Sequence, residues 1–129
     1  MKKYLFLILF SLLSGQALAE WSKIPFESQG VTTYVDKASI EKNGQLSRMW
    51  VLLDFGTSKQ KTEATPYRSI AYLWEFNCTQ SKRRPVEIRR FTENKGNGNV
   101  TIDKPSNPEW QFALPQTIYS TVQGVACSK

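Results

Sequence analysis

The 129-residue chain contains no histidine. Histidine titrates near neutral pH, supplies the base of Ser-His and Cys-His catalytic pairs, and is the commonest protein ligand of metals such as zinc. Its absence excludes those hydrolase classes and His-ligated zinc sites, and the remaining residues show no other pairing of a nucleophile with a base. We therefore expect a protein that is not an enzyme and that carries no metal or other cofactor.

Cysteine is also scarce, with only Cys78 and Cys127 present. In an oxidising compartment, two cysteines in one small domain favour a single disulfide. This bond would close a loop of roughly 50 residues and contribute on the order of 4 kcal/mol in the chain-entropy model. Two free thiols, or a bridge between two chains, are the alternatives. A disulfide would leave no thiolate to bind a metal or attack a substrate.

Long hydrophobic runs are missing, apart from one at the start of the chain. Two lysines precede the apolar run Tyr4 to Leu13, and Ala17-Leu18-Ala19 follows it, as in a secretory signal peptide cut after an Ala-x-Ala motif. A membrane anchor is the alternative, but a spanning helix needs roughly 20 apolar residues. We expect residues 1–19 to be a signal peptide and residues 20–129 to form one exported domain with no transmembrane segment.

The positive charge is modest but locally concentrated. Residues 1–19 hold two of the 17 basic residues, which leaves a net charge of +4 on the other 110 residues. The densest basic stretch comprises Lys82, Arg83, Arg84, Arg89 and Arg90. Arginine suits contact with carboxylate, sulfate or phosphate, so these residues are candidates for binding an acidic partner such as a glycosaminoglycan or a protein; nucleic acid is not expected. The alternative is a solvated turn and a charged edge strand, because strand alternation separates Arg89 from Arg90.

Alternating apolar and polar residues predict a small antiparallel β-sheet. The expected strands are residues 31–35, 45–55, 67–78, 86–92, 100–102 and a short one at 110–112. Between them we expect a helical turn at 36–40, an exposed loop at 56–66, a polar turn at 79–85 and a hairpin turn at 93–99. Ile118, Val122 and Ala126 recur every four residues and predict a helix over residues 116–127. The predicted fold class is α+β, with about five to six strands meandering in chain order, a C-terminal helix on one face, and one disulfide.

One aromatic residue stands apart from the predicted core. Trp50 alternates with Met49 and Val51 and shares its face with Arg48 and Asp54. Aromatic residues are enriched in the centres of protein interfaces. Trp50 is therefore a candidate for contact with a protein partner or with a second copy in a homodimer.

Acidic residues give no sign of catalysis. Asp36, Asp54, Glu75 and Glu87 fall in or beside the predicted strands. Their spacing is not expected to bring two of them together on one face, as a pair of catalytic carboxylates would require. Capping and surface roles are predicted instead.

The order of several short pieces resembles the bacterial surface-adhesin protein E family. They are Trp21, Tyr34-Val35-Asp36, Trp50 to Phe55, Pro66 to Ser69, Glu75 to Cys78, Gly96-Asn97-Gly98, Trp110, Pro115 and Val125 to Cys127. The resemblance covers nearly all of residues 20–129. It implies a small antiparallel sheet with a helix and a disulfide, dimerisation, and binding of host matrix proteins such as vitronectin and laminin.

The resemblance has one departure. A lipidated surface adhesin has a cysteine directly after its signal peptide, whereas Glu20 follows Ala19 here. We therefore expect an exported, unlipidated protein in the periplasm, at the cell surface or secreted. The function expected first is an adhesin E-like binding module, and the alternative is a periplasmic envelope protein with a structural or small-ligand-binding role and no host partner.

Overall fold

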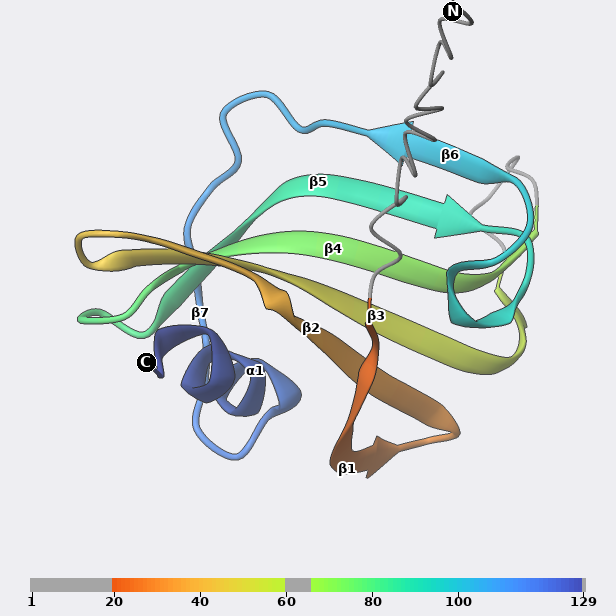
Figure 1. The fold of residues 1–129 in the computed structure, drawn as a ribbon, viewed down its shortest axis with the longest axis horizontal. Helices are drawn as coiled ribbons and strands as arrows, with labels where there is room; N and C mark the ends of the chain where they lie inside the picture. Colours follow the sequence, from red (N-terminus) through yellow and green to blue (C-terminus); the bar gives the residue numbers. More distant parts are fainter. Residues whose placement is uncertain (1–19, 60–65, 129) are drawn as a thin grey trace, which may run out of the picture.

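The computed structural model describes residues 20–59 and 66–128, so the predicted signal peptide at residues 1–19 lies outside the described residues. The described chain forms one antiparallel sheet of seven strands and a single α-helix near the C-terminus (Figure 1). The strands are β1 (Ser22–Ser28), β2 (Val31–Asn43), β3 (Leu46–Lys59), β4 (Tyr67–Asn77), β5 (Lys82–Phe91), β6 (Val100–Asp103) and β7 (Gln111–Phe112). A 3-10 turn, η1 (Asn94–Gly96), precedes β6, and the helix α1 spans Ile118–Cys127.

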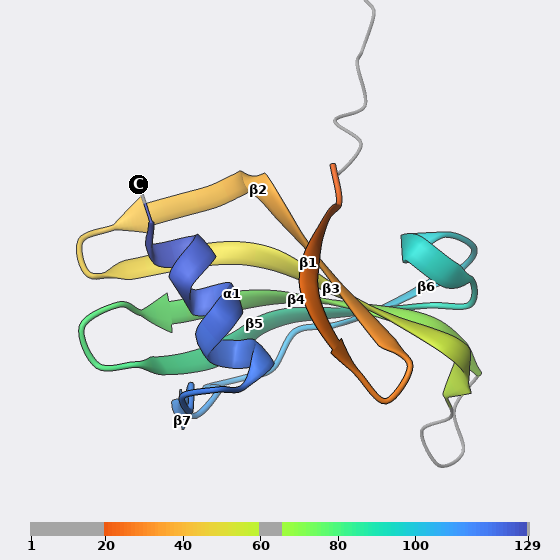
Figure 2. The same cartoon turned by 90° about the horizontal axis from the view of Figure 1, so that it is seen from below.

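The sheet follows chain order from β1 to β6, and β7 pairs with the start of β5. Helix α1 lies across one face, and β1 crosses the same face beside it (Figure 2). The predicted α+β meander with a C-terminal helix is confirmed. Within residues 20–59 and 66–128, no helix is long and apolar enough to cross a membrane.

The main core lies between this face of the sheet and α1; we call it the helix-covered face. Strand alternation turns one row of side chains from β2, β3 and β4 toward α1 and β1, which bury it. Its buried members are Val35, Met49, Val51, Trp74 and Phe76 from the sheet, Ile24 from β1, and Val122 and Ala126 from α1. This set holds the predicted core residues Met49 and Val51 and leaves Trp50 on the other face.

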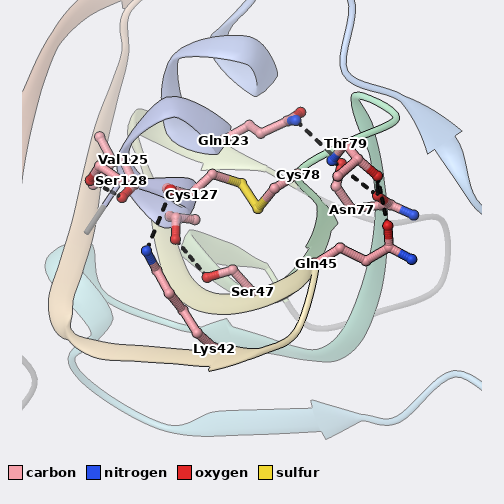
Figure 3. The surroundings of a disulfide bond; sticks show 11 residues. Lys42, Gln45, Ser47, Asn77, Cys78, Thr79, Gln123, Val125, Cys127 and Ser128 are labelled. Atoms are coloured by element: carbon pink, nitrogen blue, oxygen red, sulfur yellow. Dashed lines mark hydrogen bonds between the residues drawn. A yellow bond between two sulfur atoms is a disulfide. The ribbon is translucent and has the colours of Figure 1, made fainter.

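The disulfide joins Cys78 to Cys127, as predicted, and ties the last turn of α1 to the end of β4 (Figure 3). Beside it, the Ser47 hydroxyl donates a hydrogen bond to the Ala126 carbonyl at 2.6 Å. The Lys42 ammonium donates to the Cys127 carbonyl at 3.4 Å. The helix includes glycine and β-branched residues of low helix propensity, so these tertiary contacts hold it in place.

The helical turn predicted at residues 36–40 is wrong, because these residues belong to β2. The register of β2 against β3 shifts between Asp36 and Glu41, so the chain bulges there while pairing continues on both sides. The Asp36 carboxylate accepts the Ala38 amide at 3.1 Å. The Asp36 carboxylate therefore stabilises a bulge in a strand and does not cap a helical turn.

Two predicted loops are also partly strand. β5 begins at Lys82 instead of residue 86, because Lys82 and Arg84 pair with Asn77 and Glu75 of β4. Pro85 pairs with Trp74 where the register shifts, which is a position that tolerates a missing amide hydrogen. β3 extends to Lys59, so residues 56–59 of the predicted loop at 56–66 are strand, and residues 60–65 lie outside the described residues.

Candidate functional site

The side of the sheet opposite α1 carries the candidate site, and we call it the open face. Strand register pairs Asp36 with Trp50, Trp50 with Leu73, and Leu73 with Glu87. Directly paired residues of an antiparallel sheet point to the same side. This row therefore lies on the open face, whereas Met49 lies in the core beneath α1.

All four acidic residues considered above lie on the open face, so the prediction that no two would share a face is wrong. Spacing along the chain does not show which face a strand presents; that depends on the pairing between strands. The four do not pair with one another. The Asp36 carboxylate accepts from the Ala38 amide, Asp54 from Asn94, Glu75 from Arg48 and Arg84, and Glu87 from Arg89. In the described chain, no three acidic or cysteine side chains converge as a metal site would require.

A ladder of three charges crosses the centre of the open face. Glu75 accepts hydrogen bonds from Arg48 Nε at 2.7 Å and from Arg84 Nε at 2.8 Å. Burial by itself raises the pKa of Glu75, but the hydrogen bonds from the two arginines outweigh it and hold that pKa below the usual value. The carboxylate therefore stays ionised, and the ladder keeps an excess positive charge.

Each of the two outer arginines of the open face combines an ion pair with an aromatic contact. The Arg89 guanidinium lies 4.5 Å from the ring centre of Trp50, and its Nε is 2.5 Å from Glu87 Oε2. The Arg84 guanidinium lies 4.2 Å from the ring centre of Trp110. Such contacts hold the planar guanidinium in a fixed orientation and leave part of it accessible.

The open face is hollowed by a groove of about 970 Å³ at the end nearer η1. Trp50, Ala71, Arg89 and Phe91 contribute to it from the sheet. Its sides come from Glu20 and Trp21, from the bulge of β2, and from residues 95–97 of the turn after β5.

Strand register divides the residues predicted to bind a partner between the two faces. Lys82, Arg84, Arg89 and Trp50 lie on the open face, whereas Arg83 and Arg90 lie on the helix-covered face. The predicted separation of Arg89 from Arg90 is confirmed. Lys82 Nζ lies 5.4 Å from the ring centre of Phe112, at the far end of the open face.

Arg83 is buried, with only 8% of its surface exposed. Its guanidinium lies 3.4 Å from the ring centre of Tyr119 on α1 and 4.5 Å from that of Trp74, and it donates to Gln111 Oε1 at 2.9 Å. Burial lowers the pKa of Arg83, against the opposing effects of Tyr119 and Tyr72. These contacts fasten α1 to the sheet, and they leave Arg83 inaccessible to a partner.

Arg90 is half-buried, and its Nε makes no hydrogen bond within residues 20–59 and 66–128. Its charge acts on Tyr72, whose pKa is raised by burial and by the neighbouring Tyr119 and Tyr67, while Arg90 opposes the shift. The charge of Arg90 therefore acts on the helix-covered face and not on the open face.

Sequence reasoning missed Trp21, Phe91, Lys95 and Trp110 as parts of the open face. Trp21 and Lys95 come from segments that fold back toward the sheet, and Trp110 follows a long connection. No periodic signal in the sequence assigns these segments to a face. Phe91 is the exception, because strand alternation puts it on the same face as Arg89 and opposite Arg90, and this pattern could have assigned it to the open face.

Comparisons with known proteins agree with this architecture. The sequence profile of the surface-adhesin protein E family matches residues 21–128. Crystal form II of Haemophilus influenzae protein E is similar in structure, with a TM-score of 0.62 and 15% identity over 82% of this chain and 93% of that one. Another structure of Haemophilus influenzae protein E gives a TM-score of 0.60 and 16% identity over 83% of this chain and 92% of that one. At this identity the solved structures establish a shared fold, and no curated protein matches the sequence. Because the profile spans nearly the whole described chain, the protein belongs to the surface-adhesin protein E family.

Proposed function

We propose that this protein is an exported, non-enzymatic binding module that contacts a protein partner through the open face. The observation that carries the proposal is the pairing of partly exposed arginines with tryptophans on that face, Arg89 with Trp50 and Arg84 with Trp110. Tryptophan and arginine dominate the energetic centres of protein interfaces. The opposite face is occupied by α1 and β1, so the open face is the broad surface left for a partner.

The charge pattern favours a protein over a polyanion. Arg84 is paired with Glu75 and Arg89 with Glu87, so carboxylates interrupt the positive charge. A sulfated polymer gains most from a continuous row of cations, whereas a folded partner can match alternating charges. Burial of Arg83 removes a third arginine from the surface that the basic stretch would offer.

Host matrix proteins such as vitronectin and laminin, which the family resemblance implied, are the partners we propose to test first. Immobilised vitronectin and laminin would be titrated with the purified protein and with Trp50→Ala and Arg89→Gln. Each substitution should weaken binding about tenfold, as loss of an interface hot spot does. Lys37→Gln is the control, because Lys37 belongs to β2 but lines a hollow beside α1 instead of the groove on the open face.

Three results would contradict the proposal. The first is that the protein binds neither vitronectin nor laminin. The second is that Arg89→Gln and Lys37→Gln lose the same amount of binding affinity, and the third is that Trp50→Ala binds as tightly as the wild type. Binding to heparin that follows total charge and ignores Trp50 would instead support an acidic polymer as the partner.

We also propose that the domain works outside the cytoplasm without a lipid anchor. The support is the signal pattern of residues 1–19 together with Glu20 at the position after the predicted cut. The mass of the protein recovered from the cell envelope should equal that of residues 20–129 with one disulfide. A mass increased by acyl chains, or one that includes residues 1–19, would contradict this.

A further inference from the structure

We infer that the groove on the open face binds one apolar side chain of a partner protein together with a neighbouring carboxylate. This inference rests on the proposed function and specifies which chemistry the partner presents. Three observations support it: the walls of the groove are held by hydrogen bonds, its interior is apolar, and two cations beside it have hydrogen-bond donors without an acceptor within the described residues.

The first wall is the turn after β5, which is pinned to the open face by Asp54 and Ser69. Asp54 accepts Asn94 Nδ2 at 2.5 Å and the Lys95 amide at 3.1 Å. The Ser69 hydroxyl donates to the Glu93 carbonyl at 2.6 Å and accepts the Gly96 amide at 2.9 Å. Four hydrogen bonds to two neighbouring strands hold this turn over the sheet.

The second wall is the bulge of β2, which is fixed by Ser39. The Ser39 hydroxyl donates to the Asp36 carbonyl at 2.6 Å and accepts the Trp50 amide at 3.0 Å. The groove therefore exists before a partner arrives, so little ordering entropy is lost on binding.

The interior of the groove is apolar because Ala71 lies among aromatic rings. Ala71 pairs with Leu52 on one side and Arg89 on the other, so the shortest side chain of this row lies between the two longer ones. Trp50, Phe91 and Trp21 line the groove around it. Gly96 suits the turn beside these rings because its φ of +72° is a backbone conformation that residues with a side chain rarely adopt.

Two cations at the groove have unused hydrogen-bond donors. Arg89 uses its Nε on Glu87, and its two terminal amino groups make no hydrogen bond within the described residues. Lys95 makes no ion pair there either; its ammonium lies 5.9 Å from the ring centre of Tyr34. These donors match a carboxylate in geometry and charge.

Acidic side chains near the groove offset only part of this positive charge, because Glu87 pairs with Arg89 Nε whereas Lys95 makes no ion pair within the described residues. Asp36 is only 8% exposed and its carboxylate already accepts the Ala38 amide. Glu20 is exposed at the rim. Charge complementarity therefore selects a peptide segment with an aromatic or aliphatic residue beside an acidic one, in preference to a neutral sugar.

The test is a titration of the purified, ¹⁵N-labelled exported protein with the peptide Gly-Ser-Phe-Asp-Asp-Ser-Gly. The indole N–H signals of Trp21 and Trp50 should shift, and that of Trp74 under α1 should not. Matched peptides with Ala in place of Phe, or Asn in place of both Asp residues, should bind at least about fivefold more weakly, since each loses one half of the recognition.

Protein variants separate the groove from general charge. Lys95→Glu should weaken the acidic peptide about fivefold, whereas Lys37→Glu, with the same charge change outside the groove, should leave it unchanged. Equal losses in both variants, shifts that spare Trp21 and Trp50, or equal binding of all three peptides would overturn the inference. If the peptide tests fail while binding to vitronectin or laminin is still weakened by Trp50→Ala and Arg89→Gln, only the groove assignment is wrong. If neither substitution weakens matrix binding, the proposed function is wrong as well.

Discussion

The two faces of the sheet use the same residue type in opposite ways. Arg83 and Arg84 are neighbours in the sequence, yet Arg83 is enclosed by Trp74 and Tyr119 beneath α1 while Arg84 lies on the open face against Glu75 and Trp110. Strand alternation alone separates them. The difference shows that a basic stretch in a strand is divided by the sheet into a structural half and an accessible half.

The faces also differ in what holds them together. The helix-covered face is closed by apolar packing and by the disulfide, which are interactions of large effect on stability. The open face buries Leu52 and Ala71, but its other contacts include partly exposed ion pairs, which contribute little. The helix-covered face therefore contributes most of the stability, and the open face is available for binding a partner.

Removing the disulfide should give the largest change in stability and tests how much the helix-covered face contributes. Replacing both Cys78 and Cys127 by Ala should lower the free energy of unfolding by about 4 kcal/mol, because the bond closes a long loop of the unfolded chain. Urea unfolding followed by circular dichroism measures this. A loss below about 1 kcal/mol would show that α1 is held without the disulfide.

The two adjacent arginines give the next largest effect. Arg83→Ala should cost about 2 kcal/mol, because it removes two aromatic contacts and leaves a cavity under α1. Arg84→Ala should cost less than about 1 kcal/mol, because its ion pair is partly exposed. Equal urea midpoints for the two variants would contradict the division between faces.

Glu75 tests the charge ladder through pH. Its pKa in the folded protein lies below the ordinary value of a glutamate carboxyl, so its stabilising effect is complete above that ordinary value and is lost as pH falls through the folded pKa. Glu75→Gln should therefore be less stable than wild type at pH 7, by about 1 kcal/mol, and the gap should narrow in acid. Thermal unfolding from pH 7 to 3 measures it; a gap that widens in acid would contradict the ladder.

Much of the fold followed from periodicity. Alternation located the central strands and put Trp50 opposite Met49, while composition identified the disulfide. The errors at Asp36, Lys82 and Pro85 share one cause. Each residue lies in a segment whose local sequence is typical of a turn, but each pairs with a residue of a neighbouring strand. Tertiary pairing overrides local preference at such positions.

The candidate site was less predictable than the fold. The predicted candidates Trp50, Arg84 and Arg89 do lie on the open face, but the burial of Arg83 depends on Tyr119, which is distant in the sequence. The groove depends on Asp54 and Ser69 holding a turn from beyond β5. These are long-range hydrogen bonds with no periodic signature, and only the three-dimensional structure reveals them.

Photo-crosslinking from each face tests most directly the claim that recognition belongs to the open face. A benzoylphenylalanine would replace Trp50 in one protein and Thr121, which is exposed on α1, in another, and each would be irradiated with vitronectin and with laminin. We predict a crosslink to a matrix protein from position 50 and none from position 121. Crosslinks from position 121 alone, or equal yields from both positions, would contradict the assignment of binding to the open face.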